Sequence, residues 1–161
     1  MWFDALSVLA RLLQSTLDCL LMITPLLPPL VDNVIPCPLP CPMLCQSGTN
    51  FPWLISNVSD KHTGRPLADG ETSRLFEWKG YRIGLVGLVE REWLATLATI
   101  SLDEVVFEDF VTCGRRLAHD LKKQGAQMII ALTHMRQPND IRLLQEAPEI
   151  DLLLGGHDHD Y

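Results

Sequence analysis

Three histidines near the carboxyl end of the chain are the side chains best suited to chemistry. His157 and His159 stand two residues apart in the segment Gly155-Gly-His-Asp-His, directly after the apolar run at residues 150–154. Side chains two apart in an extended segment share a face, and neutral imidazole is a common metal ligand. The spacing therefore predicts that both histidines help to bind a divalent transition metal ion. The alternative is a polar surface turn without a ligand.

The residues before His157 predict where the strand that carries it ends. We expect the strand to stop at Leu154 and the chain to turn sharply at Gly155 and Gly156, where no Cβ atom restricts the backbone. A second apolar run, residues 127–133, ends in the same way at His134. Ligands of open α/β sheets bind at the carboxyl ends of strands, so His134 would join the other two histidines at one rim. Taken alone, His134 fits a structural role as well.

The elements that position these histidines alternate between strands and helices. The predicted strands are at 51–58, 72–78, 81–89, 105–107, 127–134 and 150–154, and the predicted helices lie within 90–100 and at 111–124 and 138–147. This order predicts an α/β fold in which crossover helices join parallel strands. The strand at 81–89 is almost entirely apolar and should be central. Its two glycines indicate close packing or a bulge.

Two motifs resemble the metal-binding end of the calcineurin-like metallophosphoesterases, in particular their 5'-nucleotidase branch. They are Ala131-Leu-Thr-His134 and Ile150-Asp-Leu-Leu-Leu-Gly-Gly-His-Asp-His159, and the resemblance covers about residues 47–161. It implies an incomplete β-sandwich of two sheets flanked by helices (αββα). It also implies a dinuclear centre of the Mn, Zn, Fe or Mg type, in which His134 and His157 bind the second ion and His159 the first.

The same resemblance implies a metal-dependent hydrolase of phosphate esters, acting on nucleotides or similar small molecules. In that family an Asp-x-His, a Gly-Asp and a Gly-Asn-His element supply the remaining site residues. This sequence contains neither Gly-Asp nor Asn-His. Its one Asp-x-His, Asp60-Lys-His62, matches a loop that the family carries after those elements, so we interpret His62 as a solvated turn residue.

We therefore expect a truncated domain, the second half of a catalytic domain, with impaired activity and no catalytic residue of its own. The alternative is a catalytically inactive fragment, or a metal-binding or protein-binding module, that keeps a partial three-histidine site. Arg136 follows His134 closely enough to meet a phosphate, but we interpret it as a solvated loop arginine. Cys113 is expected to be a packed thiol and His119 an exposed helical residue.

Residues 1–46 differ in composition from the rest of the chain. They contain no glycine, few charges and four of the five cysteines. The cysteines lack the Cys-x-x-Cys spacing of zinc sites, which favours free thiols in a reducing compartment. We place a domain boundary here, with 1–46 an irregular apolar Pro/Cys-rich segment outside the family and 47–161 the partial catalytic domain. Without a positive n-region or a long apolar span, we expect a cytoplasmic location by default.

Size and charge limit the remaining possibilities. The 161 residues, 47% of them apolar, suffice for one domain with a hydrophobic core. A net charge of −7 and the lack of basic runs argue against nucleic acid as a partner. An acidic balance does not exclude a phosphate substrate, because bound cations would dominate the local field. The sequence specifies neither the substrate-binding residues nor the oligomeric state.

Overall fold

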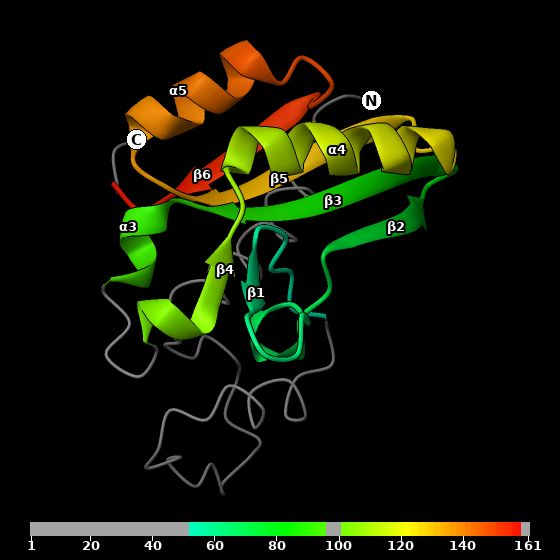
Figure 1. The fold of residues 1–161 in the computed structure, drawn as a ribbon. Coiled ribbons are helices and arrows are strands. Elements are labelled where there is room, and N and C mark those ends of the chain that lie inside the picture. The colour runs from blue at the N-terminus through cyan, green and yellow to red at the C-terminus, as the bar shows by residue number, and fades with distance from the viewer. Residues whose placement is uncertain (1–51, 96–100, 159–161) are drawn as a thin grey trace, which may run out of the picture. The chain divides into compact units, whose positions relative to one another are not determined.

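The computed structural model describes residues 52–95 and 101–158 (Figure 1). Six strands are present there: β1 (Val58–Asp60), β2 (Ser73–Trp78), β3 (Tyr81–Val89), β4 (Val105–Phe107), β5 (Met128–His134) and β6 (Leu152–Gly156). The helices are α3 (Arg91–Leu94), α4 (Phe110–Lys123) and α5 (Gln137–Glu146), with short 3-10 turns η1 (Leu67–Asp69) and η2 (Leu102–Glu104). The segment 1–46, its boundary and His159 lie outside the described residues.

The main sheet has four strands in the order β2-β3-β5-β6. Strands β2 and β3 form an antiparallel hairpin whose turn residues, Lys79 and Gly80, both have positive φ, as a tight two-residue turn requires. Strands β3, β5 and β6 are parallel. The α/β class, the hairpin, the central place of β3 and the parallel order are thus confirmed. A separate two-stranded sheet pairs β1 with β4 in antiparallel register.

Helices α4 and α5 pack together over one face of the main sheet (Figure 1). Their shared core with β3 and β5 includes Leu88, Leu117, Leu121, Ile129 and Leu143. Helix α4 begins where the Asp109 carboxylate accepts hydrogen bonds from two backbone N–H groups, and it ends before Gly125, whose φ is +92°. None of the helices in the described ranges has the length and apolar character needed to cross a membrane.

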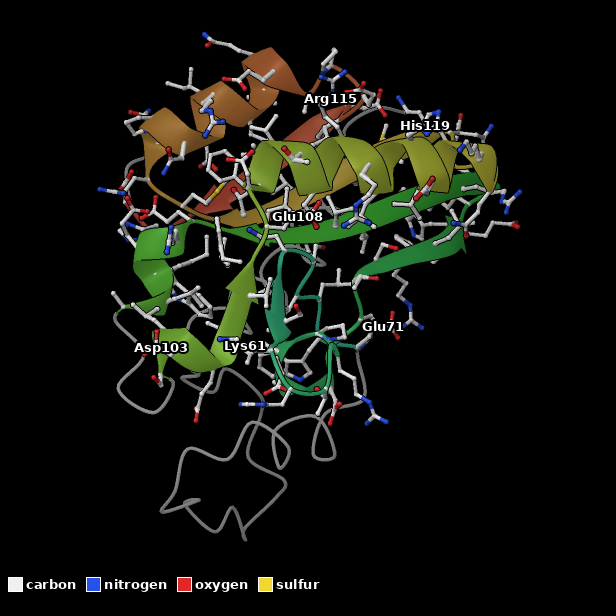
Figure 2. The ribbon with its side chains drawn as sticks, viewed as in Figure 1. Lys61, Glu71, Asp103, Glu108, Arg115 and His119 are labelled. Carbon is white, nitrogen blue, oxygen red and sulfur yellow. The ribbon has the colours of Figure 1, made fainter. Side chains whose placement is uncertain are left out.

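Two side chains of α4 lie as the sequence predicts. Cys113 is fully buried in the core, and burial raises the pKa of its thiol to about 12. His119 and Arg115 lie on the face of α4 that points away from the sheet (Figure 2). The helix is therefore amphipathic in the expected register, with polar residues outward and the thiol inward.

The strand predicted at 51–58 is wrong for most of its length. Only Val58 joins a strand, and Leu54 makes an isolated bridge to Glu71. The apolar residues of this segment are explained by packing on β3, since a Cβ atom at Gly87 would lie 2.7 Å from the Leu54 carbonyl oxygen. The backbone N–H of Ser56 also donates to the Gly87 carbonyl over 2.8 Å. Gly87 thus permits close packing, one of the two roles expected for it.

The predicted end of the last strand is also wrong. Gly155 and Gly156 continue β6, pairing with Thr133 and His134 of β5, and the chain departs from the sheet only at His157. A Cβ atom at Gly155 would lie 2.6 Å from an Asp140 carboxylate oxygen on α5. This glycine is therefore needed for close approach to the helix and not for a turn.

Candidate metal centre

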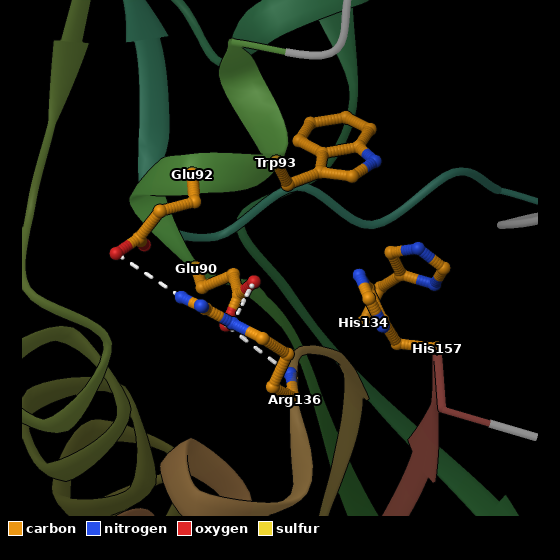
Figure 3. A pocket seen from close by; sticks show the side chains of 6 residues that line it. All are labelled: Glu90, Glu92, Trp93, His134, Arg136 and His157. Atoms are coloured by element: carbon orange, nitrogen blue, oxygen red, sulfur yellow. Dashed lines mark hydrogen bonds and ion pairs between the residues drawn. The ribbon is translucent and has the colours of Figure 1, made fainter.

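Adjoining strand ends bring two of the three predicted histidines together. His134 is the last residue of β5 and is paired in register with Gly156, so His157 follows directly on the neighbouring strand. The two imidazole ring centres are 5.1 Å apart, with the ring planes inclined by 53° (Figure 3). The parallel pairing of β5 with β6 therefore creates the histidine pair.

The alternation of side chains along β5 turns His134 away from the helices. Thr133, its neighbour, faces α5 and donates its hydroxyl hydrogen to Asp140 over 2.7 Å. His134 consequently lies on the opposite face of the sheet, where it is only 7% exposed. The indole of Trp93, on α3, meets the His134 ring edge to face, with centres 6.4 Å apart. Burial and this aromatic contact together restrict the orientation of the imidazole.

His157 is held by its backbone and by the residue that follows it. Its φ is +136°, a conformation that favours glycine and costs a residue with a Cβ atom on the order of 1–3 kcal/mol. Its Nδ1 lies 3.0 Å from the Asp158 carboxylate, which also accepts the backbone N–H of Gln137 over 2.6 Å. The Gln137 N–H and then the imidazole hold the pKa of Asp158 below its usual value. His157 is thereby tied to the amino end of α5.

A hollow of about 330 Å³ opens in front of the two imidazoles (Figure 3). It is lined by Glu90, Glu92, Trp93, His134, Arg136 and His157. Four elements contribute to this lining: Glu90 follows β3, two residues belong to α3, two lie at the end of β5, and His157 follows β6. The site therefore lies at the carboxyl ends of the parallel strands, where the sequence predicts it.

Glu90 is a buried carboxylate beside the histidine pair. It is 2% exposed and accepts the backbone N–H of Arg136 at 3.1 Å, the guanidinium Nε–H at 2.9 Å and the Asn139 amide at 2.6 Å. Burial raises the pKa of Glu90, but the hydrogen bonds from Arg136 and Asn139 outweigh that effect and hold it below its usual value. Glu90 is thus an ionised group inside the protein.

Arg136 is an exposed residue between β5 and α5, as predicted, but it also takes part in the site through ion pairs that the sequence did not indicate. Its guanidinium pairs with Glu90 and also with the exposed carboxylate of Glu92, at 3.1 Å. The two carboxylates raise the pKa of Arg136 further above its usual value, the hydrogen bond to Glu90 being the main cause. The arginine organises the wall of the hollow through these pairs.

The spacing of the two histidines fits a shared metal ion. A tetrahedral ion with Zn–N bonds of about 2.1 Å places the centres of two imidazole ligands about 5 Å apart, which agrees with the observed 5.1 Å. In the described ranges no group of three or more His, Cys, Asp or Glu side chains forms a metal-binding cluster. The described part of the site is thus a two-imidazole pair at the edge of a hollow.

The Asp-x-His segment, Asp60-Lys-His62, takes no part in this arrangement. The Asp60 carboxylate accepts hydrogen bonds from the backbone N–H groups of His62 and Thr63 and from the Thr63 hydroxyl, which closes a surface turn. These bonds, the Thr63 backbone N–H first, lower the pKa of Asp60. His62 is exposed. The segment is a turn, which is the interpretation that the sequence favours.

Comparison with known proteins places this arrangement in a known class. A 5'-nucleotidase from Vibrio cholerae is 30% identical in an alignment of 121 positions that covers 67% of this chain and 22% of that protein. A solved 5'-nucleotidase precursor from Thermus thermophilus superposes with a TM-score of 0.64 at 20% identity, over 73% of this chain and 23% of that one. A solved calcineurin-like phosphoesterase from Bacillus subtilis gives 0.61 at 21% identity, over 71% and 39%. No model of a protein family matches the chain.

The fold is that of the calcineurin-like phosphoesterases. Within that class, the chain is related to the 5'-nucleotidase branch over about 70% of its length. The chain spans about a fifth of the length of the curated relatives that it matches. The resemblance seen in the two histidine motifs is thus confirmed at the level of family and fold.

The sequence did not reveal Glu90, Trp93 or Asn139 as residues of the site. One signal was available for Glu90, because it follows a buried strand as directly as His157 does, and a carboxylate in that place points to the same rim. No local signal existed for Asn139 or Trp93, since their contacts join segments that are far apart in the sequence.

Proposed function

We propose that this chain carries part of the divalent-metal centre of a phosphate-ester hydrolase of the 5'-nucleotidase kind. In this proposal His134 and His157 bind one ion and His159 binds the other. The observation that supports it best is the pair of imidazoles, 5.1 Å apart at the ends of two parallel strands. The relatives' names favour nucleotides or similar phosphate esters as substrates, and the imidazole ligands suit Zn or Fe. Manganese is included because the family resemblance implies it.

The residues around the pair would act by holding the ligands in place. A bound divalent ion would supply a polarised water and would neutralise charge on the phosphoryl oxygens. His134, buried beside Trp93, would offer a ring with a restricted orientation. His157 would keep its place through its contact with Asp158. Two carboxylates, Glu90 and Glu92, and one arginine line this wall of the hollow. Because negative groups outnumber positive ones there, a bound metal ion would have to provide the attraction for a phosphate.

We further propose that residues 47–161 form the family part of the chain, with residues 1–46 outside it, and that the isolated chain turns over slowly. The sequence holds neither the Gly-Asp nor the Asn-His element that the family uses. Two cations about 3.5–4 Å apart repel strongly unless anionic ligands compensate their charge. A chain without the bridging carboxylate should therefore bind the ion of the histidine pair more readily than a second ion.

Manganese binding and phosphatase activity on an aryl phosphate test this function. Calorimetric titration of the full chain with Mn²⁺ should show binding that is lost in His157→Ala. The matched control is His119→Ala, which removes an exposed histidine from the outer face of α4 and should bind like the wild type. Hydrolysis should be slow and should require His157. Binding that survives in His157→Ala, or hydrolysis that is equal in both variants, would refute the proposal.

A further inference from the structure

Burial of the Glu90 carboxylate in its ionised form is unfavourable in free energy. An ionised carboxylate inside a protein costs several kcal/mol unless hydrogen bonds compensate it. Glu90 receives this compensation from the backbone N–H and guanidinium of Arg136 and from the amide of Asn139. All of these donors belong to one short stretch, the entry and first turn of α5. The contacts therefore fix that turn against the end of β3.

The same turn also contacts the ends of the other two parallel strands. Asp140 accepts the hydroxyl of Thr133, the residue before His134, and the backbone N–H of Gln137 donates to Asp158, the residue after His157. The stretch 136–140 thus holds one residue at the end of each of β3, β5 and β6. A shift of this turn would move both histidines, each through its neighbour in the sequence.

We infer that Glu90 is a positioning residue for the histidine pair, acting through the first turn of α5. It lines the same hollow as the imidazoles, and its carboxylate accepts hydrogen bonds from Arg136 (Figure 3). It also accepts a hydrogen bond from the Asn139 amide. Its influence on the ligands is therefore indirect, through the position of the turn. For metal binding the inference rests on the proposed function, whereas the placement of the imidazoles can be measured without a metal.

The test compares Glu90→Gln with Glu92→Gln in the full chain. Both variants remove one negative charge from the lining of the hollow and from the surroundings of Arg136, but Glu92 is 65% exposed and bonds only to the outer guanidinium nitrogen. Loss of a group that hydrogen-bonds a metal ligand directly typically weakens metal binding about 10–100-fold, and Glu90 acts one contact further from the ligands. We therefore expect Mn²⁺ affinity to fall by the lower end of that range, about 10-fold, in Glu90→Gln. It should fall clearly less in Glu92→Gln, which removes the same charge but keeps the contacts that fix the first turn of α5.

A second measurement distinguishes a positioning role of Glu90 from an effect on stability, and it does not depend on the proposed function. The imidazole NMR signals of His134 and His157 in the metal-free chain should shift in Glu90→Gln and stay in place in Glu92→Gln. Unchanged signals, or equal Mn²⁺ affinities in the two variants, would overturn the inference. If the wild type binds no Mn²⁺, the proposed function fails and the metal-free signals alone decide the positioning role. If Glu90→Gln unfolds, Asn139→Ala replaces it, with a smaller shift in the same direction expected and no shift refuting the inference.

Discussion

Replacing Gly155 by alanine tests how closely α5 approaches the strand that carries His157. The new Cβ atom would lie 2.6 Å from the Asp140 carboxylate, closer than such atoms come in real structures. Asp140 would have to move, which breaks its 2.7 Å hydrogen bond from Thr133, worth about 1.5–3 kcal/mol for a charged acceptor. Alanine regains about 0.5–1 kcal/mol over glycine inside a strand. We expect a net loss of about 1–2 kcal/mol in the free energy of unfolding.

A double variant shows whether the carboxylate is the cause. In an Asp140→Ala background the obstacle is gone, so Gly155→Ala should be neutral or should stabilise by up to about 1 kcal/mol. The coupling between the two substitutions should then reach at least about 1 kcal/mol. Urea unfolding followed by far-UV circular dichroism measures all four proteins, provided that their m values agree. An equal loss in both backgrounds would refute the reasoning, because the added methyl group would then be destabilising for a reason other than its contact with Asp140.

Three further predictions concern single residues. Because the folded pKa of Glu90 lies below its usual value near 4.5, its contribution to stability is complete above that value and is lost as the pH falls through the folded pKa. The difference in unfolding free energy between wild type and Glu90→Gln should therefore be larger at pH 7 than at pH 3, and an equal difference at both would contradict this. Cys113, buried and with a pKa raised to about 12, should react with a thiol reagent only after unfolding. Because the chain has four other cysteines, the labelled site is identified by peptide mapping, and rapid labelling of Cys113 in the native protein would show that the core opens there. Asp109→Ala removes the cap of α4 and should cost about 0.5–2 kcal/mol, measured by urea unfolding, with Asp103→Ala, in a short exposed turn, as the near-neutral control.

Local patterns in the sequence predicted most of the described fold. Most predicted elements have their observed ends within two residues of the predicted ones, namely β2, β3, β5, α4 and α5. These predictions succeeded because apolar periodicity, the end of a helix at Gly125 and the start of a helix at Pro138 are local signals. The meeting of His134 and His157 followed from the same reasoning, since parallel strands joined by a crossover end at one rim.

The failures arose where distant segments meet. In the segment predicted as a strand at 51–58, Leu54 packs on β3 at Gly87, and the composition alone could not distinguish such packing from a strand. Gly155 suggested a turn because glycine weakens strands, but the nearby Asp140 makes the missing side chain a requirement within the strand. The exposure of Arg136 was predicted correctly, but its ion pair with Glu90 was missed because Glu90 lies far away in the sequence. Each correction depends on a contact that local patterns do not contain.

The unbroken succession of β5, α5 and β6 has a consequence for how the site forms during folding. The two histidines of the pair, His134 and His157, lie within residues 133–158 together with Thr133, Asp140 and Asp158. Few residues must therefore be ordered to bring them together. Contacts of short sequence separation carry a small loop-closure entropy and form quickly. We therefore expect the histidine pair to assemble within the crossover, with the link from Glu90 forming only when the β2–β3 hairpin joins the sheet.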